Sequence, residues 1–267
     1  MPQPIKVNLL SYATNDFSLG RRLLNFSSRL HGVNQRVNLR VEDLLKTQFY
    51  EKHKHILDQP RGAGYWLWKP YFILETLKQM QDGEVLIYSD CGQFFRKNIA
   101  PLTTLTKDEK GVVLFYNWDV LSRYCKRDVF VAMECDSTEY HKAPLIHANL
   151  QIYRKCEFAI SFLEEVLHFA TQNELITDAP NTLGLPNLPD YIDHRHDQSI
   201  TSLLAHKRGL TLYLDPTQFK VKNANFEFGR GDLFLDPLPY QSVVYVHRYR
   251  NKQIARLIPD LTKKIFK

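Results

Sequence analysis

The chain has 267 residues, of which 44% are hydrophobic, so it can form one large α/β domain with a substantial core and is not intrinsically disordered. Its net charge of +6 suits an anionic partner, but the basic residues are mostly scattered, which argues against a nucleic-acid groove. The four cysteines form no CxxC pair, so a structural zinc site is not expected.

The first half of the chain alternates strand-like and helix-like patterns. Apolar or alternating runs predict strands at residues 7–13, 36–41, 85–88 and 111–116. Apolar residues at helical spacing predict helices at residues 18–30, 42–55 and 71–80. This alternation predicts βαβ units and a mixed, mostly parallel sheet flanked by helices.

After about residue 117 the pattern is less regular. Short strands are predicted at residues 130–133, 149–153 and 243–246. Helices are predicted at residues 156–171, 198–206 and 254–266, the last of them basic. Residues 173–190 contain three prolines together with glycine and asparagine, so they are predicted to form a long loop.

The strand predicted at residues 85–88 ends in Ser89, Asp90 and Gly92. Open α/β sheets bind ligands beyond the carboxyl ends of their strands, and a carboxylate there could hold a divalent cation against a diphosphate. The same residues also suit an ordinary turn after a strand. Both interpretations stay open from this segment alone.

Residues 61–70, RGAGYWLWKP, combine glycines, aromatic rings and cations. Trp66 and Trp68 could stack on a base or a sugar, and Arg61 and Lys69 could neutralise phosphate. The segment is neither a Walker loop nor the dinucleotide fingerprint. The alternative is a corner of aromatic packing.

Residues 193–199, DHRHDQS, place several titratable groups before an apolar helix. Asp197 would lie at the helix N-terminus, where a negative charge is stabilised. The alternative is a helix cap with solvated charges. His194 and His196 lack the i, i+4 spacing of a helical zinc pair, so a metalloprotease is not supported. Likewise, His247 at the end of the last strand is either a metal ligand or a structural histidine.

Together these motifs resemble bacterial and viral GT-A-type glycosyltransferases of the polysaccharide-associated kind, over roughly residues 7–250. The resemblance is carried by RGxGYWxWKP, YxDxG, KRD, NLP and HRHDQS. It implies a Rossmann-like nucleotide-binding sheet and a nucleotide-sugar donor. It also implies a Mn²⁺ or Mg²⁺ ion held by an Asp-x-Asp motif and a late histidine.

The resemblance assigns roles to individual residues of this chain. Asp90 and His247 match the metal ligands, and Asp197 with Gln198 matches the catalytic acidic segment near the sugar and the acceptor. The donor-binding residues that it implies are Arg61, Trp66, Trp68, Lys69, Ser89, Asn149, Gln151 and His196. The second aspartate of the motif is missing, because Tyr88 and Gly92 stand at that spacing. The metal site is therefore weak, or absent with Lys69 and arginines supplying the positive charge.

The function implied is transfer of a sugar from a nucleoside diphosphate sugar to a glycan or lipid-linked acceptor hydroxyl, with retention of configuration. The alternatives are a non-catalytic glycan- or nucleotide-binding module and a nucleotidyltransferase. The latter normally has a glycine-rich basic loop after its first strand, which residues 9–15 do not show. We expect one domain over residues 1–267. It would have a nucleotide-binding half to about residue 116, an acceptor-side half over residues 117–250 and a basic helix over residues 251–267.

The N-terminus lacks the pattern of a signal peptide, and no run approaches about 20 apolar residues. We therefore expect a cytoplasmic protein without a nucleic-acid partner. The basic residues that cluster after residue 247 are compatible with peripheral contact at an anionic membrane face.

Overall fold

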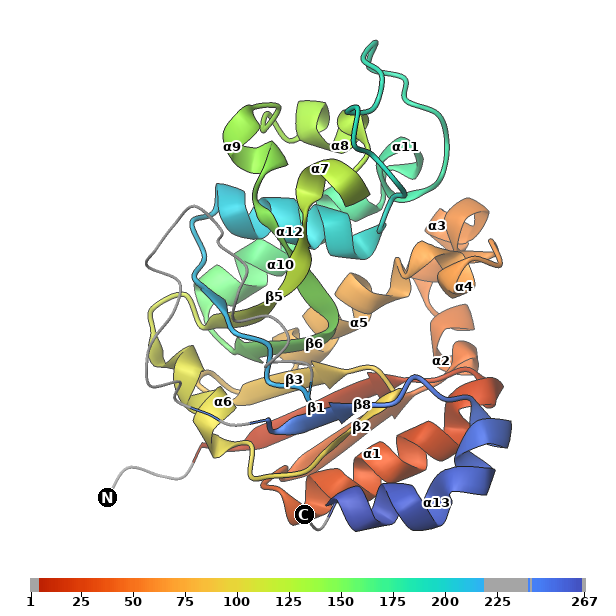
Figure 1. Ribbon diagram of the computed structural model, residues 1–267, viewed down its shortest axis with the longest axis vertical. Helices are drawn as coiled ribbons and strands as arrows, with labels where there is room; N and C mark the ends of the chain where they lie inside the picture. Colours follow the sequence, from red (N-terminus) through yellow and green to blue (C-terminus); the bar gives the residue numbers. More distant parts are fainter. Residues whose placement is uncertain (1–4, 219–239, 241, 266–267) are drawn as a thin grey trace.

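The computed structural model describes residues 5–218, 240 and 242–265 (Figure 1). Six strands form one sheet in the order β2-β1-β3-β6-β5-β7. Their bounds are β1 Val7–Tyr12, β2 Gln35–Leu39, β3 Val85–Ser89, β5 Val112–Val120, β6 Pro144–Arg154 and β7 Leu212–Tyr213. A separate antiparallel pair joins β4 (Gln93–Phe95) to β8 (Val244–Val246).

The large sheet is mixed and mostly parallel, as predicted. β1 runs parallel to β2 and β3, and β5 runs parallel to β7. β6 is antiparallel to both of its neighbours, β3 and β5. Because β2 and β3 lie on opposite sides of β1, the chain reverses its direction across the sheet at β1. Such a switch point opens a crevice at the carboxyl ends of the strands.

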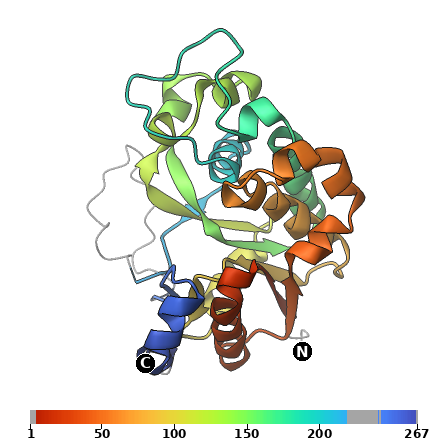
Figure 2. The same cartoon turned by 90° about the vertical axis from the view of Figure 1, so that its right-hand side faces the viewer.

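The central strands β1 and β3 are buried along their whole length and mostly apolar, because helices cover both faces of the sheet (Figure 2). Leu10 and Leu86 belong to the core on one face, whereas Leu9 and Ile87 belong to the core on the other. On the first face pack α3 (Gln48–Leu57), α5 (Trp68–Lys78), α10 (Glu157–Ala170) and α12 (Asp197–Lys207). On the other side, α1 (Ser18–Leu30) packs against α13 (Asn251–Ile265).

The remaining helices are short and lie mostly at the rims. They are α2 Val41–Leu45, α4 Gly62–Tyr65, α6 Ala100–Thr104, α7 Leu121–Tyr124, α8 Arg127–Ala132, α9 Thr138–His141 and α11 Asn173–Ile176. Two 3₁₀ turns complete the described elements, at Asn15–Phe17 and Leu105–Lys107. No helix in the described ranges is long and apolar enough to cross a bilayer.

One predicted element is wrong and several have different bounds. The strand predicted at 130–133 is part of helix α8, because a short buried apolar run does not distinguish a strand from a helix. The helix predicted at 42–55 is two helices, since Thr47 caps a new one by accepting a hydrogen bond from Tyr50 N at 3.0 Å.

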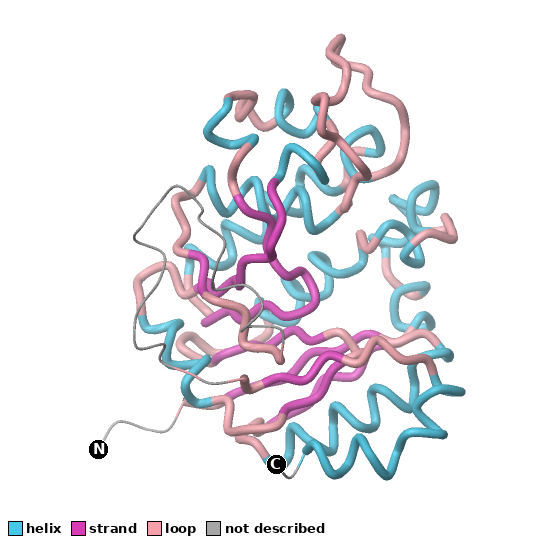
Figure 3. The backbone as a smooth tube through the Cα atoms, viewed as in Figure 1, coloured by secondary structure: helices cyan, strands magenta, loops and turns pink. Residues whose placement is uncertain are grey.

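In the second half the strand predicted at 149–153 is the end of the longer β6, and β5 extends to Val120. The loop predicted at 173–190 begins with α11 and continues irregularly to α12 (Figure 3). The basic helix begins at Asn251 rather than 254, and its predicted end, Phe266, lies outside the described residues.

Candidate functional site

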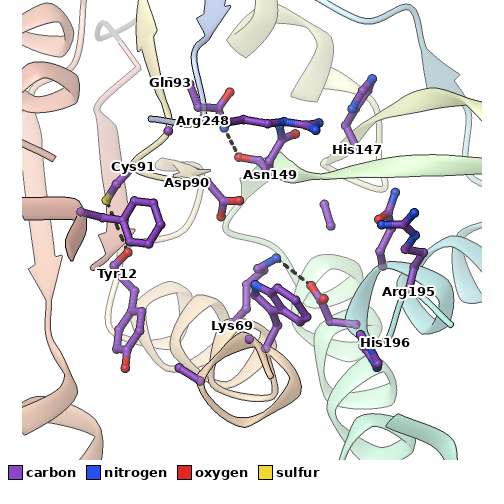
Figure 4. A pocket seen from close by; sticks show the side chains of 18 of the residues that line it. Tyr12, Lys69, Asp90, Cys91, Gln93, His147, Asn149, Arg195, His196 and Arg248 are labelled. Atoms are coloured by element: carbon purple, nitrogen blue, oxygen red, sulfur yellow. Dashed lines mark hydrogen bonds and ion pairs between the residues drawn. The ribbon is translucent and has the colours of Figure 1, made fainter. Parts of the chain in front are cut away.

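A cavity of about 890 Å³ opens at the carboxyl ends of β1 and β3, at the switch point of the sheet (Figure 4). Tyr12 and Asp90 follow from these two strands. The other walls come from residues 60–69, from residues 117–119 after the buried part of β5, from residues 145–149 of β6, and from residues 195–198 at the start of α12. Val246, Arg248 and Arg250 close the remaining side.

Lys69 and Asp197 form a buried ion pair in the cavity wall. Lys69 Nζ lies 2.8 Å from Asp197 Oδ2, and the two side chains are only 4% and 5% exposed. Burial alone would lower the pKa of Lys69, but the charges of Asp197 and Asp90 outweigh it and raise that pKa. Burial raises the pKa of Asp197, and Lys69 opposes part of this effect. Lys69 therefore keeps its proton at neutral pH and fixes the position of the Asp197 carboxylate.

Gly62 to Trp66 form a left-handed turn beside this pair. All five residues have φ between 51° and 94°, although Ala63, Tyr65 and Trp66 are not glycine. Each such non-glycine residue costs about 1–2 kcal/mol. A Cβ on Gly62 would lie 2.3 Å from the Trp66 ring, and one on Gly64 would lie 2.6 Å from Leu57 Cα. The glycines thus permit close internal packing, and strain of this kind is typical of functional sites.

The aromatic rings of this segment both pack internally and line the cavity. Trp68 stacks on Tyr12 with ring centroids 4.1 Å apart, and Trp66 stacks on His196 at 5.6 Å. His196 itself has φ 51° and is buried, and its Nδ1 donates to the Ile176 carbonyl at 2.7 Å. Both sequence interpretations of the aromatic segment, a packing corner and a ligand wall, therefore describe the same residues.

Arg61 lines the cavity but is already paired. Its guanidinium bonds Asp178 at 2.9 Å and both oxygens of Asp193 at 2.9 and 3.1 Å. These contacts connect the left-handed turn to the loop between α11 and α12.

Asp90 lies in the cavity beside Asn149. The Tyr88 hydroxyl donates to Asp90 Oδ1 at 2.5 Å, and Asp90 N donates to the Asn149 carbonyl at 2.9 Å. The Gln93 amide donates to the same carbonyl. In Figure 4 Asp90, Asn149 and Lys69 face the same space.

Three predicted site residues do not line the cavity. Ser89 and Gln151 are buried within the sheet, where Gln151 donates to the Ala148 carbonyl at 3.1 Å and accepts from the Tyr153 hydroxyl. His247 packs on the other side of its strand, against the rings of Phe94 and Tyr249. The other nine predicted residues, Arg61, Trp66, Trp68, Lys69, Asp90, Asn149, His196, Asp197 and Gln198, all line the cavity.

The structure also adds residues that the sequence did not single out as site residues. They include Tyr12, Gln93, Asp119 and His147. His147 Nε2 lies 3.5 Å from Oδ2 of the buried Asp215. Burial would raise the pKa of Asp215, but His147 and the two hydrogen bonds from Thr217 outweigh burial and lower that pKa. Only the fold brings Asp215 behind the strand that carries His147, so local sequence held no signal for this pair.

No protein-family model matches the chain, and no curated protein sequence matches it. Solved structures do match its fold. The bifunctional glycosyltransferase WbbM superposes with a TM-score of 0.54 at 9% identity, over 99% of this chain and 50% of that chain. An active-site mutant of LgtC superposes with a TM-score of 0.51 at 10% identity, over 96% of this chain and 95% of that chain. Mouse xyloside xylosyltransferase 1 superposes with a TM-score of 0.47 at 11% identity, over 92% of this chain and 98% of that chain.

The likeness to WbbM and LgtC shows that the chain has the fold of the GT-A glycosyltransferases. At these identities it shows the fold alone.

Proposed function

We propose that the protein is a glycosyltransferase that moves a sugar from a nucleoside diphosphate sugar to a hydroxyl group of a glycan or lipid-linked acceptor. One observation carries the proposal: in a chain with this fold, the Lys69–Asp197 pair and Asp90 face one large cavity at the sheet's switch point. Its volume of about 890 Å³ is within the range of small-molecule sites.

The donor occupies the side of the cavity formed by the nucleotide-binding half, up to about residue 116. Tyr12, Trp66 and Trp68 offer aromatic surface to the base or sugar, and Asp90, Asn149 and Lys69 surround the sugar and the diphosphate. Arg61, Ser89 and Gln151 act as positioning residues. Arg61 holds the loop before α12, and the side chains of Ser89 and Gln151 donate to the backbone carbonyls of Asp90 and Ala148, which line the cavity. His196 supports Trp66 in the same way.

The reaction breaks the bond between the anomeric carbon and the phosphate oxygen, and both electrons leave with the diphosphate. The anomeric carbon becomes oxocarbenium-like, as in glycoside hydrolysis. Asp197, held as an anion beside Lys69, stabilises this positive charge. Gln198 donates to the Ile146 carbonyl at 2.6 Å, which fixes its side chain next to Asp197.

The acceptor hydroxyl then forms the new bond to the anomeric carbon. We assign retention of configuration, in which attack comes from the face that the diphosphate leaves and the hydroxyl proton passes to the departing phosphate oxygen. Trp118, Asp119, Tyr124, His147 and Arg195 line the acceptor side. A lipid-linked acceptor also fits the exposed basic residues of α13, Lys252, Arg256 and Lys263, which would contact an anionic membrane surface.

Thermal-shift screening with UDP-, GDP- and ADP-sugars tests the proposal. A donor that fits should raise the melting temperature by mass action. The absence of a shift with every sugar nucleotide, with and without Mn²⁺, would refute it. Binding without release of the nucleotide in the presence of any acceptor would instead support the alternative, a non-catalytic binding module.

A further inference from the structure

Gly92 stands two residues after Asp90, where the GT-A resemblance expects a second carboxylate. Its carbonyl accepts hydrogen bonds from His247 N at 2.8 Å and from Arg248 N at 3.0 Å. A Cβ at this position would lie 3.2 Å from Arg248 Cα and 3.4 Å from Arg248 N. A side chain at residue 92 would therefore require the Arg248 backbone to move. The close approach of Arg248 explains why the position is glycine.

The described residues do not fit a divalent cation at Asp90. Asp90 is a single carboxylate, and its Oδ1 already accepts from Tyr88. His247 Nδ1 accepts from Tyr249 N at 2.9 Å, and the ring packs away from the cavity. Among the described residues no group of three His, Cys, Asp or Glu side chains is arranged to hold a metal ion. Beside Asp90 the wall offers only the neutral amide oxygens of Asn149 and Gln93, both without a hydrogen-bond partner. A divalent cation at this place would therefore have one carboxylate as its single charged ligand among the described residues, where such ions prefer several carboxylates.

The segment after β8 places cations in the cavity instead. Residues alternate along it: Val246, Arg248 and Arg250 line the cavity, whereas His247 and Tyr249 pack on the opposite side. Arg248 is exposed and adopts φ 57°, a conformation that is strained for a non-glycine residue. Figure 4 shows its side chain extending into the cavity beside Asn149.

Arg248 differs from the other cations of the cavity in its pairing. Lys69 pairs with Asp197, and Arg61 pairs with Asp178 and Asp193. Arg195 Nε lies 4.0 Å from Asp193 Oδ2, and Arg250 Nη1 lies 3.7 Å from Asp16 Oδ2. For Arg248, no carboxylate of the described residues lies within ion-pair distance. Its guanidinium therefore faces the cavity with its charge uncompensated by the described part of the chain.

We infer that Arg248 takes the place of the divalent cation and binds the donor diphosphate directly, so that donor binding does not depend on Mn²⁺ or Mg²⁺. A guanidinium can bond two phosphate oxygens at once and stabilises the charge that the leaving diphosphate develops. Asp90 then accepts hydrogen bonds from donor hydroxyl groups rather than binding a cation. The inference rests on the proposed function and specifies how its donor is held.

Titration calorimetry with UDP, GDP and CDP tests the inference, with each nucleotide measured in EDTA and in Mn²⁺. We expect equal affinity in both buffers. The Arg248→Gly variant should bind roughly 10- to 100-fold more weakly, the loss of one hydrogen-bonded charge contact. Glycine suits φ 57°, so this variant should fold without strain. Arg248→Lys should bind with an affinity between those of the wild type and Arg248→Gly. Arg22→Ala, an exposed site on α1 outside the cavity, controls for net charge and should bind like the wild type.

Each outcome separates the two proposals. Binding that requires Mn²⁺ would overturn the inference and leave the proposed function standing. Metal-independent binding that Arg248→Gly does not weaken would remove the role of Arg248. The absence of nucleotide binding in both buffers would overturn the proposed function and the inference with it.

Discussion

Replacing Lys69 with methionine tests the importance of the buried ion pair. The change keeps the length of the side chain but leaves the Asp197 carboxylate buried without its cation. Both side chains are almost fully buried, and removing one partner of such a pair costs about 3–5 kcal/mol. A matched control is Lys78→Met, because Lys78 forms an exposed pair with Glu164 at the similar distance of 2.9 Å. That pair should contribute at most about 1 kcal/mol.

Urea unfolding, followed by tryptophan fluorescence, measures both variants. Loss of Lys69 removes a charge that lowers the pKa of Asp197, so that pKa rises further above its unfolded value. A carboxyl group whose pKa is raised by folding favours the folded state at low pH and loses this effect as the pH rises. The destabilisation by Lys69→Met should therefore be smaller at about pH 5 than at about pH 8.

Two results would refute this reasoning. The first is that Lys69→Met loses no more free energy of unfolding than Lys78→Met does. The second is that the free energy of unfolding lost in Lys69→Met is the same at both pH values. The double variant Lys69→Met, Asp197→Leu adds an independent check, since replacing both charges should recover most of the stability.

Three further predictions concern other parts of the molecule. Ala63→Gly should stabilise the protein by up to about 1 kcal/mol, because Ala63 has φ 51°, which glycine adopts without strain. Ala255→Gly, inside helix α13, should instead destabilise it by about 1 kcal/mol. A thermal unfolding measurement in which the melting temperatures of both variants move in the same direction would contradict this. Arg61→Ala should increase hydrogen exchange in residues 177–196, to which its two ion pairs connect the left-handed turn, and unchanged exchange would remove its positioning role. Changing Lys252, Arg256 and Lys263 to glutamine should weaken sedimentation with anionic vesicles by about 1 kcal/mol per charge, and equal sedimentation would exclude α13 as a membrane contact.

The sequence predicted β1, β3 and the first half of β5 well because these segments are buried on both faces and consist mostly of apolar residues. It also singled out Lys69 and Asp197, which both line the cavity, but it could not show that they form an ion pair, since the pairing depends on how α5 and α12 pack. His247 and Arg248 illustrate the limit most clearly. They are neighbours with metal-binding and phosphate-binding potential, and only the direction in which each side chain points distinguishes them. Ser89 and Gln151 failed to line the cavity for the same reason.

Release of nucleotide from sugar nucleotides, measured for the wild type and for Asp197→Asn, tests the central claim most directly. The account predicts that the wild type releases the nucleotide from at least one donor in the presence of an acceptor. Asp197→Asn, which removes the carboxylate charge at nearly constant shape, should lose about 100-fold or more of this rate. Asp260→Asn, an exposed carboxylate on α13, should keep the full rate. Full activity of Asp197→Asn, or no release from any donor by the wild type, would contradict the account.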